Sequence, residues 1–279
     1  MTYKELYEYG CLELKAAEIC EYKLDARLLF EYVLDTSYSD LLVNPDKKVL
    51  SGDEEKYKEL IYKRATHIPL QHLTGTQNFM GLDFTVSKDV LIPRQDTETL
   101  VEEVLKDLHD GMRILDMCTG SGCILLSLLH YSNDTLGVGA DISEGALHVA
   151  KKNADDLGLS DRVSFINSDL FENVEGKFDI LVSNPPYIRT EEISTLMPEV
   201  KDHDPFIALD GHESGLYFYE KIIEAAPSFL KKGSHVAFEI GNDQGEAVSK
   251  LMIDAGYKEV AVINDLCGNA RVVKGYYYV

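Results

Sequence analysis

From Met112 onward, short apolar runs alternate with segments of helical periodicity, and this alternation is the strongest constraint on the fold. The runs that predict strands lie at residues 112–116, 136–141, 162–167, 178–183, 234–240 and 258–263. Parallel strands need long crossover connections, usually helices, so the pattern predicts an α/β domain whose parallel sheet has helices on both faces. A final run, 271–273 with 276–279, follows after a short loop, which favours an antiparallel hairpin at the sheet edge.

The N-terminal part of the chain has a different pattern. Apolar residues recur at helical spacing throughout residues 1–70, with turn signals at 44–46 and 51–53, so a small helical domain is expected. Such a domain is either a packing module or a surface for substrate docking, and the pattern supports both. Residues 71–93 alternate weakly and contain interrupting glycines, which predicts a β-hairpin linker before the α/β domain at 94–279.

A tetrapeptide with unusual chemistry follows the predicted strand at 178–183. Pro185 and Pro186 cannot continue that strand, because proline lacks a backbone N–H and has a fixed φ. A stiff loop is therefore expected at the carboxyl edge of the sheet, where ligands bind in open α/β folds. The Asn184 side-chain oxygen and the Pro185 carbonyl can accept both hydrogens of one planar –NH2 group, and the Tyr187 ring can cover its face. We predict Asn184, Pro185 and Tyr187 as catalytic residues. The predicted substrate-binding residues are Asn184, Pro185, Pro186 and Tyr187.

A glycine-containing loop, Asp116–Gly122, closes the first predicted strand and opens a helix. Glycines at such a turn let a ligand approach the backbone. The dinucleotide fingerprint is not met, since Cys118 stands where its first glycine is required. An acid at Asp116 also disfavours a pyrophosphate and favours a positively charged ligand. S-adenosylmethionine fits this loop, because it carries an ammonium, a sulfonium and a ribose but no phosphate.

An acidic residue ends the next predicted strand, and another follows the strand after it. The carboxylate of Asp141 can accept both hydroxyls of a ribose. Asp169 can accept from an adenine amino group while Leu170 packs on the ring, although Asp169 is also suited to cap a helix. The predicted cofactor contacts are Asp116, Cys118, Thr119, Gly120, Ser121, Gly122, Asp141, Asp169, Leu170 and Asn184.

The charge of the chain limits its partners. With a formal net charge of −21 and no Lys/Arg-rich run, direct nucleic-acid binding is not expected. No apolar run approaches the roughly 20 residues that span a bilayer, and no signal peptide is visible, so no membrane partner and a cytoplasmic location are expected. The five cysteines lack metal-ligand spacing, so no metal is expected either. A monomer is the default expectation.

Four segments together carry a family resemblance. Their ranges are Leu91–Glu98, Asp116–Gly122, Asn184–Tyr187 and Phe238–Gly241. In order and spacing they resemble the bacterial protein-(glutamine-N5) methyltransferases, specifically the release-factor branch (the HemK/PrmC family), over nearly the whole chain. The resemblance implies a seven-stranded, Rossmann-like methyltransferase domain that uses S-adenosylmethionine. It also implies a substrate, the glutamine of the Gly-Gly-Gln motif in class 1 peptide chain release factors, whose methylation supports translation termination.

The same resemblance implies residue roles. It places cofactor contacts at Cys118–Gly122, Asp141, Leu170 and Asn184, and glutamine contacts at Asn184–Tyr187. The chain departs from the family pattern where Cys118 replaces a usual Gly, Leu170 a frequent Trp and Gln95 a common Pro. The alternatives are a glutamine methyltransferase for a ribosomal protein, an adenine-N6 methyltransferase for nucleic acid, and a non-catalytic adenosine-binding protein.

Other residues have two interpretations. Arg94, Asp96 and Glu98 either support the cofactor pocket or begin a helix, with Asp96 as its cap. Glu239, at the end of an apolar strand, is expected to be a buried acid with a partner near the site. The segment Glu191–Gly215 is long for a loop, which is typical of a binding or lid segment.

Overall fold

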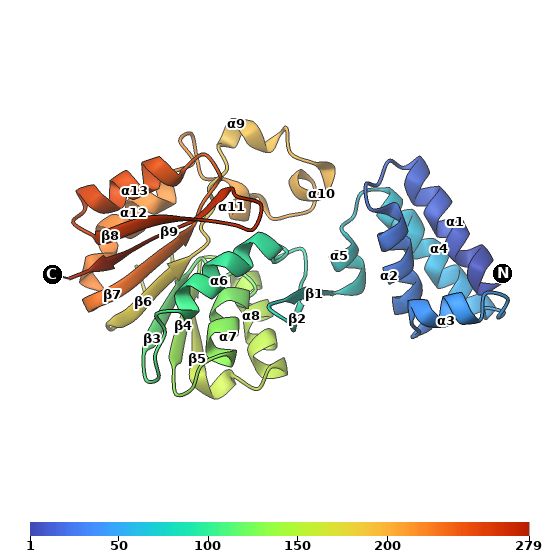
Figure 1. Ribbon diagram of the computed structural model, residues 1–279, viewed down its shortest axis with the longest axis horizontal. Coiled ribbons are helices and arrows are strands. Elements are labelled where there is room, and N and C mark those ends of the chain that lie inside the picture. The colour runs from blue at the N-terminus through green and yellow to red at the C-terminus, as the bar shows by residue number, and fades with distance from the viewer. Residues whose placement is uncertain (279) are drawn as a thin grey trace. The chain divides into compact units, whose positions relative to one another are not determined.

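The computed structural model describes residues 1–278, so the predicted end of the last strand at Val279 lies outside the described part. The chain forms two compact units, which are described separately (Figure 1). One unit comprises residues 1–76 and 197–203, and the other comprises 77–196 and 204–279. Residues 71–76 therefore group with the helices rather than with the predicted linker, and 197–203 join them from far along the sequence.

The first unit is helical, as its sequence pattern predicts. Its helices are α1 Tyr3–Ala16, α2 Tyr22–Leu34, α3 Tyr38–Val43, α4 Ser51–Ala65, α5 Leu70–Thr74 and α10 Pro198–Lys201. A capping box starts α1, because Thr2 and Glu5 each accept a hydrogen bond from the backbone N–H of the other. Leu6, Phe30 and Ile61, from α1, α2 and α4, are fully buried in the core of this unit.

A buried ion-pair cluster ties α10 to the other helices of this unit. Arg64 donates to Asp25 Oδ2 at 2.7 Å and to Glu199 Oε1 of α10 at 3.2 Å. His67 Nδ1 lies 3.1 Å from the same Glu199 oxygen. Buried charges persist only when they are paired, so this cluster gives a physical reason for the grouping of α10 with the N-terminal helices.

The second unit is built around a seven-stranded sheet with strand order β5-β4-β3-β6-β7-β9-β8. Its strands are β3 Arg113–Met117, β4 Leu136–Asp141, β5 Val163–Asn167, β6 Phe178–Ser183, β7 Leu230–Glu239, β8 Lys258–Asn264 and β9 Ala270–Tyr277. Strands β3 to β7 pair in parallel, whereas β9 is antiparallel to both β7 and β8. The predicted strands and hairpin are confirmed, although β7 begins before the predicted residue 234.

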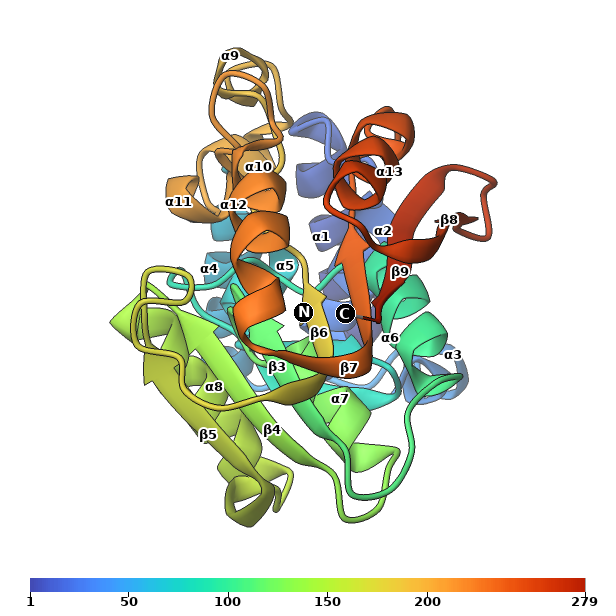
Figure 2. The same ribbon diagram turned by 90° about the vertical axis from the view of Figure 1, so that its left-hand side faces the viewer.

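Helices cover both faces of this sheet, which also confirms the predicted fold class. They are α6 Glu98–Leu105, α7 Cys123–His130, α8 Glu144–Asp156, α12 Tyr217–Ala225 and α13 Gly245–Asp254. Neighbouring β3 residues belong to opposite cores, Ile114 to the one with α6 and α7 and Leu115 to the one with α12 and α13, because strand side chains alternate between faces. Figure 2 shows α12 and α13 together on one side of the sheet.

The sheet register brings the predicted site residues to one edge. Met117 pairs with both Ala140 and Ser183, and Ser183 pairs with Phe238. The residues that follow these positions are Cys118, Asp141, Asn184 and Glu239. Parallel strands end at a common edge, so these residues lie side by side although they are up to 121 positions apart (239 − 118) in the chain.

The remaining elements are short. A two-stranded hairpin, β1 Thr76–Phe79 and β2 Leu82–Thr85, is shorter than the predicted linker because Leu70–Thr74 form α5. The segment after the tetrapeptide contains α9 Thr190–Ile193 and α11 Phe206–Leu209 besides α10. Single 3-10 turns occur at Gln95–Thr97, Ser160–Arg162 and Ala226–Ser228. Within residues 1–278, no helix combines the length and the apolar character required to cross a membrane.

Candidate active site

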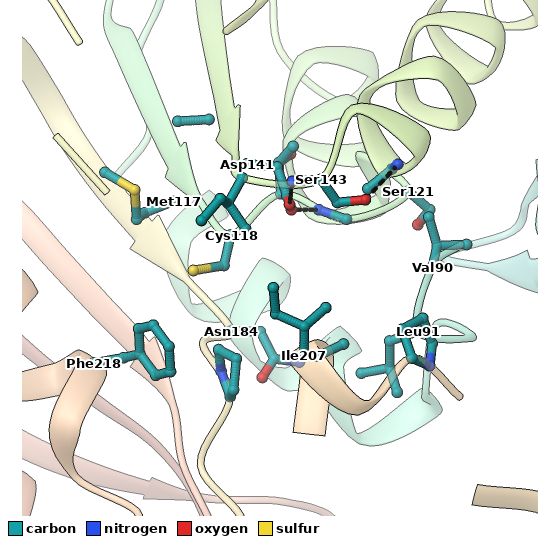
Figure 3. Close-up of a pocket in the computed structure, with 18 of the residues that line it drawn as sticks. Val90, Leu91, Met117, Cys118, Ser121, Asp141, Ser143, Asn184, Ile207 and Phe218 are labelled. Atoms are coloured by element: carbon teal, nitrogen blue, oxygen red, sulfur yellow. Dashed lines mark hydrogen bonds between the residues drawn. The ribbon is translucent and has the colours of Figure 1, made fainter. Parts of the chain in front are cut away.

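A cavity of about 350 Å³ lies at the carboxyl edge of the sheet. Its walls include the loops after β3, β4, β5 and β6, together with residues of the segment 205–218. Figure 3 shows Asp141 and Ser143 on one side of the cavity and Asn184, Ile207 and Phe218 on the opposite side. The cavity therefore joins the predicted cofactor loop to the predicted acceptor loop.

The glycine loop adopts the backbone that its sequence predicts. Gly120 and Gly122 have positive φ angles of 55° and 78°, and Cys118 has 62°. A left-handed conformation favours glycine, which explains physically why a glycine is usual where this chain has Cys118. Among the loop residues, Cys118, Thr119, Gly120 and Ser121 line the cavity.

Asp116 lies beneath this loop rather than on the cavity wall. Its side chain is fully buried, and its Oδ2 accepts a hydrogen bond from the Thr119 hydroxyl at 2.6 Å. Burial raises the pKa of Asp116 to about 7, the bond from Thr119 opposes this rise, and the negative charge of Asp141 adds to it. Asp116 is therefore linked to the cavity wall only through its hydrogen bond with Thr119. A direct contact between Asp116 and the cofactor stays a prediction.

Asp141 is held by backbone groups and lines the cavity. Its Oδ2 accepts from the Gly120 N–H and its Oδ1 accepts from the Ser143 N–H, both at 2.9 Å. Burial raises the pKa of Asp141, and these two N–H bonds act in the opposite direction. Each carboxylate oxygen keeps a further lone pair, so Asp141 can still receive the two hydroxyls of a ribose.

Asp169 and Leu170 also line the cavity, as predicted. Asp169 is exposed, and the residues after it form a turn in which Glu172 N–H donates to the Asp169 carbonyl. No helix begins at Asp169 in this described segment, so the alternative role as a helix cap is wrong. Leu170 has a positive φ of 47°, and the Ser168 hydroxyl donates to its carbonyl at 2.7 Å.

The tetrapeptide presents only part of its predicted set to this cavity. Asn184 and Pro186 line the cavity, whereas Pro185 is buried and is not part of the wall. Within residues 1–278, the Asn184 carboxamide forms no hydrogen bond, so its oxygen is free to accept from a ligand. Asn184 is therefore the polar group of this loop that directly faces the cavity.

Tyr187 is turned away from the cavity toward the interior. Its hydroxyl donates to Glu239 Oε1 at 3.4 Å, and its ring packs against the core beneath α12 and α13. Burial raises the pKa of Tyr187, with a further contribution from the charge of Glu239, so the phenol stays neutral. Its predicted role over the substrate amide stays a prediction, because in this structure Glu239 holds the ring off the cavity wall.

Glu239 is the buried acid that the sequence predicts. It is 2% exposed. Burial raises its pKa to about 7, while the Thr97 hydroxyl and the charge of Arg271 lower it. Tyr219 donates to the Glu239 backbone carbonyl at 2.8 Å. Because the Glu239 side chain accepts from the Tyr187 hydroxyl, Glu239 supports the tetrapeptide.

A helix does begin at Glu98, as one interpretation of these residues expects, but Asp96 is not its cap, because Thr97 stands at the N-cap position and no described side chain caps α6. Arg94 lines the cavity and donates to Asp204 at 2.6 Å. Asp96 pairs with Arg271 at 3.1 Å, and Glu98 accepts from the Met80 backbone N–H at 2.7 Å. Arg94 thus forms part of the cavity wall. Asp96 and Glu98 instead bond the segment before and at the start of α6 to Arg271 and to Met80.

Sequence reasoning missed the apolar side of the cavity. Its residues include Val90, Leu91, Ile207, Ala208, Tyr217 and Phe218. Ile207 and Ala208 lie in the segment Glu191–Gly215, whose unusual length predicts a binding segment without naming residues. The contribution of these two residues depends on how residues 205–212 lie against the cavity.

The charge of the cavity favours a cationic ligand. Asp89, Asp141 and Asp169 are on its wall, and Asp116 lies directly beneath. Arg94 is the only Lys or Arg among the described lining residues, and Asp204 pairs with it. An acidic wall of this kind attracts positive charge and repels phosphate, while the apolar side can receive an aromatic or aliphatic group.

Comparison with known proteins supports a specific family. The PrmC N-terminal domain model matches residues 5–75, and the methyltransferase small domain model matches residues 94–199. The release factor glutamine methyltransferase of Clostridium botulinum is 41% identical over 283 residues, with 100% of both chains covered. The enzyme of the same name from Agrobacterium fabrum is 41% identical over 266 residues, covering 93% of this chain and 92% of the relative.

Solved structures agree on the fold. A methyltransferase from Pyrococcus furiosus matches with a TM-score of 0.54 and 19% identity, covering 82% of this chain and 100% of that one. A 16S rRNA methyltransferase of T. thermophilus, in complex with AdoMet and guanosine, matches with a TM-score of 0.52 and 15% identity, covering 72% and 49% of the two chains. These likenesses show a methyltransferase fold. Because the chain is 41% identical to a release factor glutamine methyltransferase over the full length of both chains, it belongs to the release factor glutamine methyltransferase family.

Proposed function

We propose that this protein transfers a methyl group from S-adenosylmethionine to the side-chain amide nitrogen of the glutamine in the Gly-Gly-Gln motif of class 1 peptide chain release factors. The single observation that carries this proposal is the free Asn184 carboxamide on the wall of an acidic cavity, in a chain of this family. A carboxamide hydrogen-bonds well to another carboxamide. The acidic wall suits a cationic cofactor.

The residues present fit S-adenosylmethionine. Asp141 would receive the ribose hydroxyls through the lone pairs that Gly120 and Ser143 leave free. Asp169 and Leu170 would flank the adenine, and Asp116 beneath Thr119 would stabilise positive charge. The cofactor supplies the methyl group as an electrophile.

The acceptor side has to work by positioning. An amide nitrogen is a weak nucleophile because its lone pair is delocalised into the carbonyl. Asn184 would accept from one of its N–H groups, aim its out-of-plane lobe at the methyl group and stabilise the positive charge that builds on nitrogen. The Pro185 carbonyl is the predicted acceptor for the second N–H group, but Pro185 is not on the cavity wall in this structure, so the loop would have to shift to present it. The methylated nitrogen then carries an extra, strongly acidic proton, which it releases to restore the neutral amide.

The helical unit would dock the release factor. It matches the PrmC N-terminal domain model, and its exposed apolar side chains include Leu42, Val43 and Leu50. We expect the protein to act in the cytoplasm, as a monomer and without direct nucleic-acid contact, in line with its net charge of −21.

Labelled S-adenosylmethionine tests this proposal. The chain is incubated separately with a class 1 release factor, a ribosomal protein and DNA, and methylated positions are located by peptide mass spectrometry. One methyl group on the Gly-Gly-Gln glutamine is the expected result. A release factor whose motif glutamine is replaced by alanine serves as the control. Label on the ribosomal protein or on DNA instead, with none on the release factor, would reject the proposed substrate.

A further inference from the structure

Gln244 is a buried carboxamide whose hydrogen bonds join three separate segments. It follows β7, directly before α13, and is 4% exposed. Its Nε2 donates to the Tyr187 carbonyl at 3.0 Å and to the Gly215 carbonyl at 3.1 Å. Its Oε1 accepts from the Gly241 N–H at 2.9 Å. Both N–H groups and the oxygen of Gln244 are therefore engaged, all with backbone atoms.

The segments that Gln244 joins surround the acceptor side of the cavity. Tyr187 ends the tetrapeptide, and Gly215 ends the segment that contributes Ile207 and His212 to the cavity wall. Contact between them is close, because a Cβ atom added at Gly215 would lie 2.6 Å from the Tyr187 carbonyl oxygen and 2.8 Å from Gln244 Nε2. Gly215 also has a positive φ of 70°, so a side chain there is unfavourable on both grounds.

Tyr187 is thereby anchored at both ends. The Tyr187 hydroxyl donates to Glu239, and the Tyr187 backbone carbonyl accepts from Gln244. Asn184 lies three positions earlier, on a loop stiffened by two prolines. A fixed Tyr187 therefore restricts where the Asn184 oxygen points.

We propose that Gln244 is a positioning residue for methyl transfer, which sets the Asn184 acceptor relative to the cofactor by fastening the tetrapeptide to the end of the segment 188–215. This inference rests on the proposed function. Amide methylation without a base depends on geometry, and a displacement of about 1 Å at such a site costs about a hundredfold in rate. Gln244 does not reach the cavity itself.

The substitution Gln244→Glu tests this role. It keeps the shape of the side chain but replaces the two donors with an oxygen that faces the Tyr187 and Gly215 carbonyls. We expect kcat on the release factor to fall by about a hundredfold. The Kd of S-adenosylmethionine, measured by calorimetry, should stay within about twofold of the unsubstituted protein, because the cofactor contacts lie on other loops.

Asn153→Asp is a matched comparison, because Asn153 is an equally buried carboxamide with the same bonding pattern. It is 1% exposed, donates to the carbonyls of Thr85 at 3.1 Å and Ser121 at 2.9 Å, and accepts from the Thr85 N–H at 2.7 Å. It fastens the cofactor loop instead. We expect both substitutions to lower Tm, because each leaves buried carbonyl groups without a donor. Asn153→Asp should weaken cofactor binding, however, rather than lower kcat at saturating cofactor.

The outcomes separate the inference from the proposed function. If Gln244→Glu lowers Tm but keeps kcat within about twofold well below the Tm, Gln244 is merely structural and the inference is wrong. If Gln244→Glu does not fold, Gln244→Met removes the donors without adding charge, and unchanged kcat in that variant would likewise overturn it. An unsubstituted protein that methylates no release factor would reject the proposed function itself, and the inference with it.

Discussion

The two halves of the cavity are held in place in different ways. On the cofactor side, Thr119 bonds to Asp116 within one loop, and Asp141 accepts from Ser143 two positions on and from Gly120 on the adjacent strand end. On the acceptor side, the tetrapeptide is held by Glu239 and Gln244, more than 50 positions away in the chain.

This difference predicts which property a substitution in each half of the cavity changes. The bonds on the cofactor side join strand ends and turns that are close in the chain, and Asn153 adds one longer-range connection between Ser121 and Thr85. Remote side chains reach the acceptor loop only when β6 and β7 pair in register. Substitutions on the cofactor side should therefore change affinity, and substitutions on the acceptor side should change turnover.

The largest effect is expected for Asn184→Ala, on the acceptor side. Removing a preorganised group that stabilises charge in the transition state costs about a hundredfold to a thousandfold in kcat. Single-turnover methylation of the release factor measures it, with Tm confirming an intact fold. Asn133→Ala, at an exposed site on the loop after α7, is the matched control and should leave kcat unchanged. If Asn184→Ala keeps more than about a tenth of the rate, its assignment fails.

Asp141→Asn should break the cofactor side instead. A hydrogen bond to a charged group contributes about 1.5–3 kcal/mol, so the Kd of S-adenosylmethionine should rise by about tenfold to a hundredfold. Turnover at saturating cofactor should change far less, because Asp141 does not touch the acceptor loop. Calorimetry and steady-state kinetics on the same preparation separate the two effects. A loss confined to kcat would contradict the division between the halves.

Cofactor affinity should also depend on pH through Asp116. Burial raises the pKa of Asp116 to about 7, so below that pH the carboxyl is protonated and neutral. A cationic ligand prefers the ionised carboxylate, so affinity should rise with pH, by roughly eightfold between about pH 6 and about pH 7.5. Asp116→Asn should remove most of this dependence. A pH profile that is identical in the two proteins would show that Asp116 does not interact with the ligand charge.

The smallest effect is expected for Cys118→Gly. Its φ of 62° is unfavourable for cysteine, and relieving it stabilises by about 1 kcal/mol, but removing the side chain also loses its packing against the core. These terms oppose each other, so the unfolding free energy should change by less than about 1 kcal/mol. Denaturant unfolding measures it. A loss well above that value would mean that the thiol has a structural role beyond its packing.

Much of the candidate site could be predicted because its chemistry is local in the sequence. Prolines at 185 and 186 end a strand wherever it lies, and the Asp116–Gly122 segment forms a strand-to-helix turn without outside help. The position of Tyr187 could not be predicted in the same way. Its ring has an apolar body and a polar tip, and whether it faces the cavity or the interior depends on Glu239.

The α/β class, the positions of the strands and the polar groups at their ends could be predicted from the sequence, because they follow from periodicity and from residue chemistry along a few neighbouring positions. The strand order, the placement of residues 205–218 on the cavity wall, and the bonding of Gln244 and Glu239 to Tyr187 follow only from the tertiary structure. Those contacts join residues far apart in the chain, so they exist only once the sheet has set its register and packed its two faces.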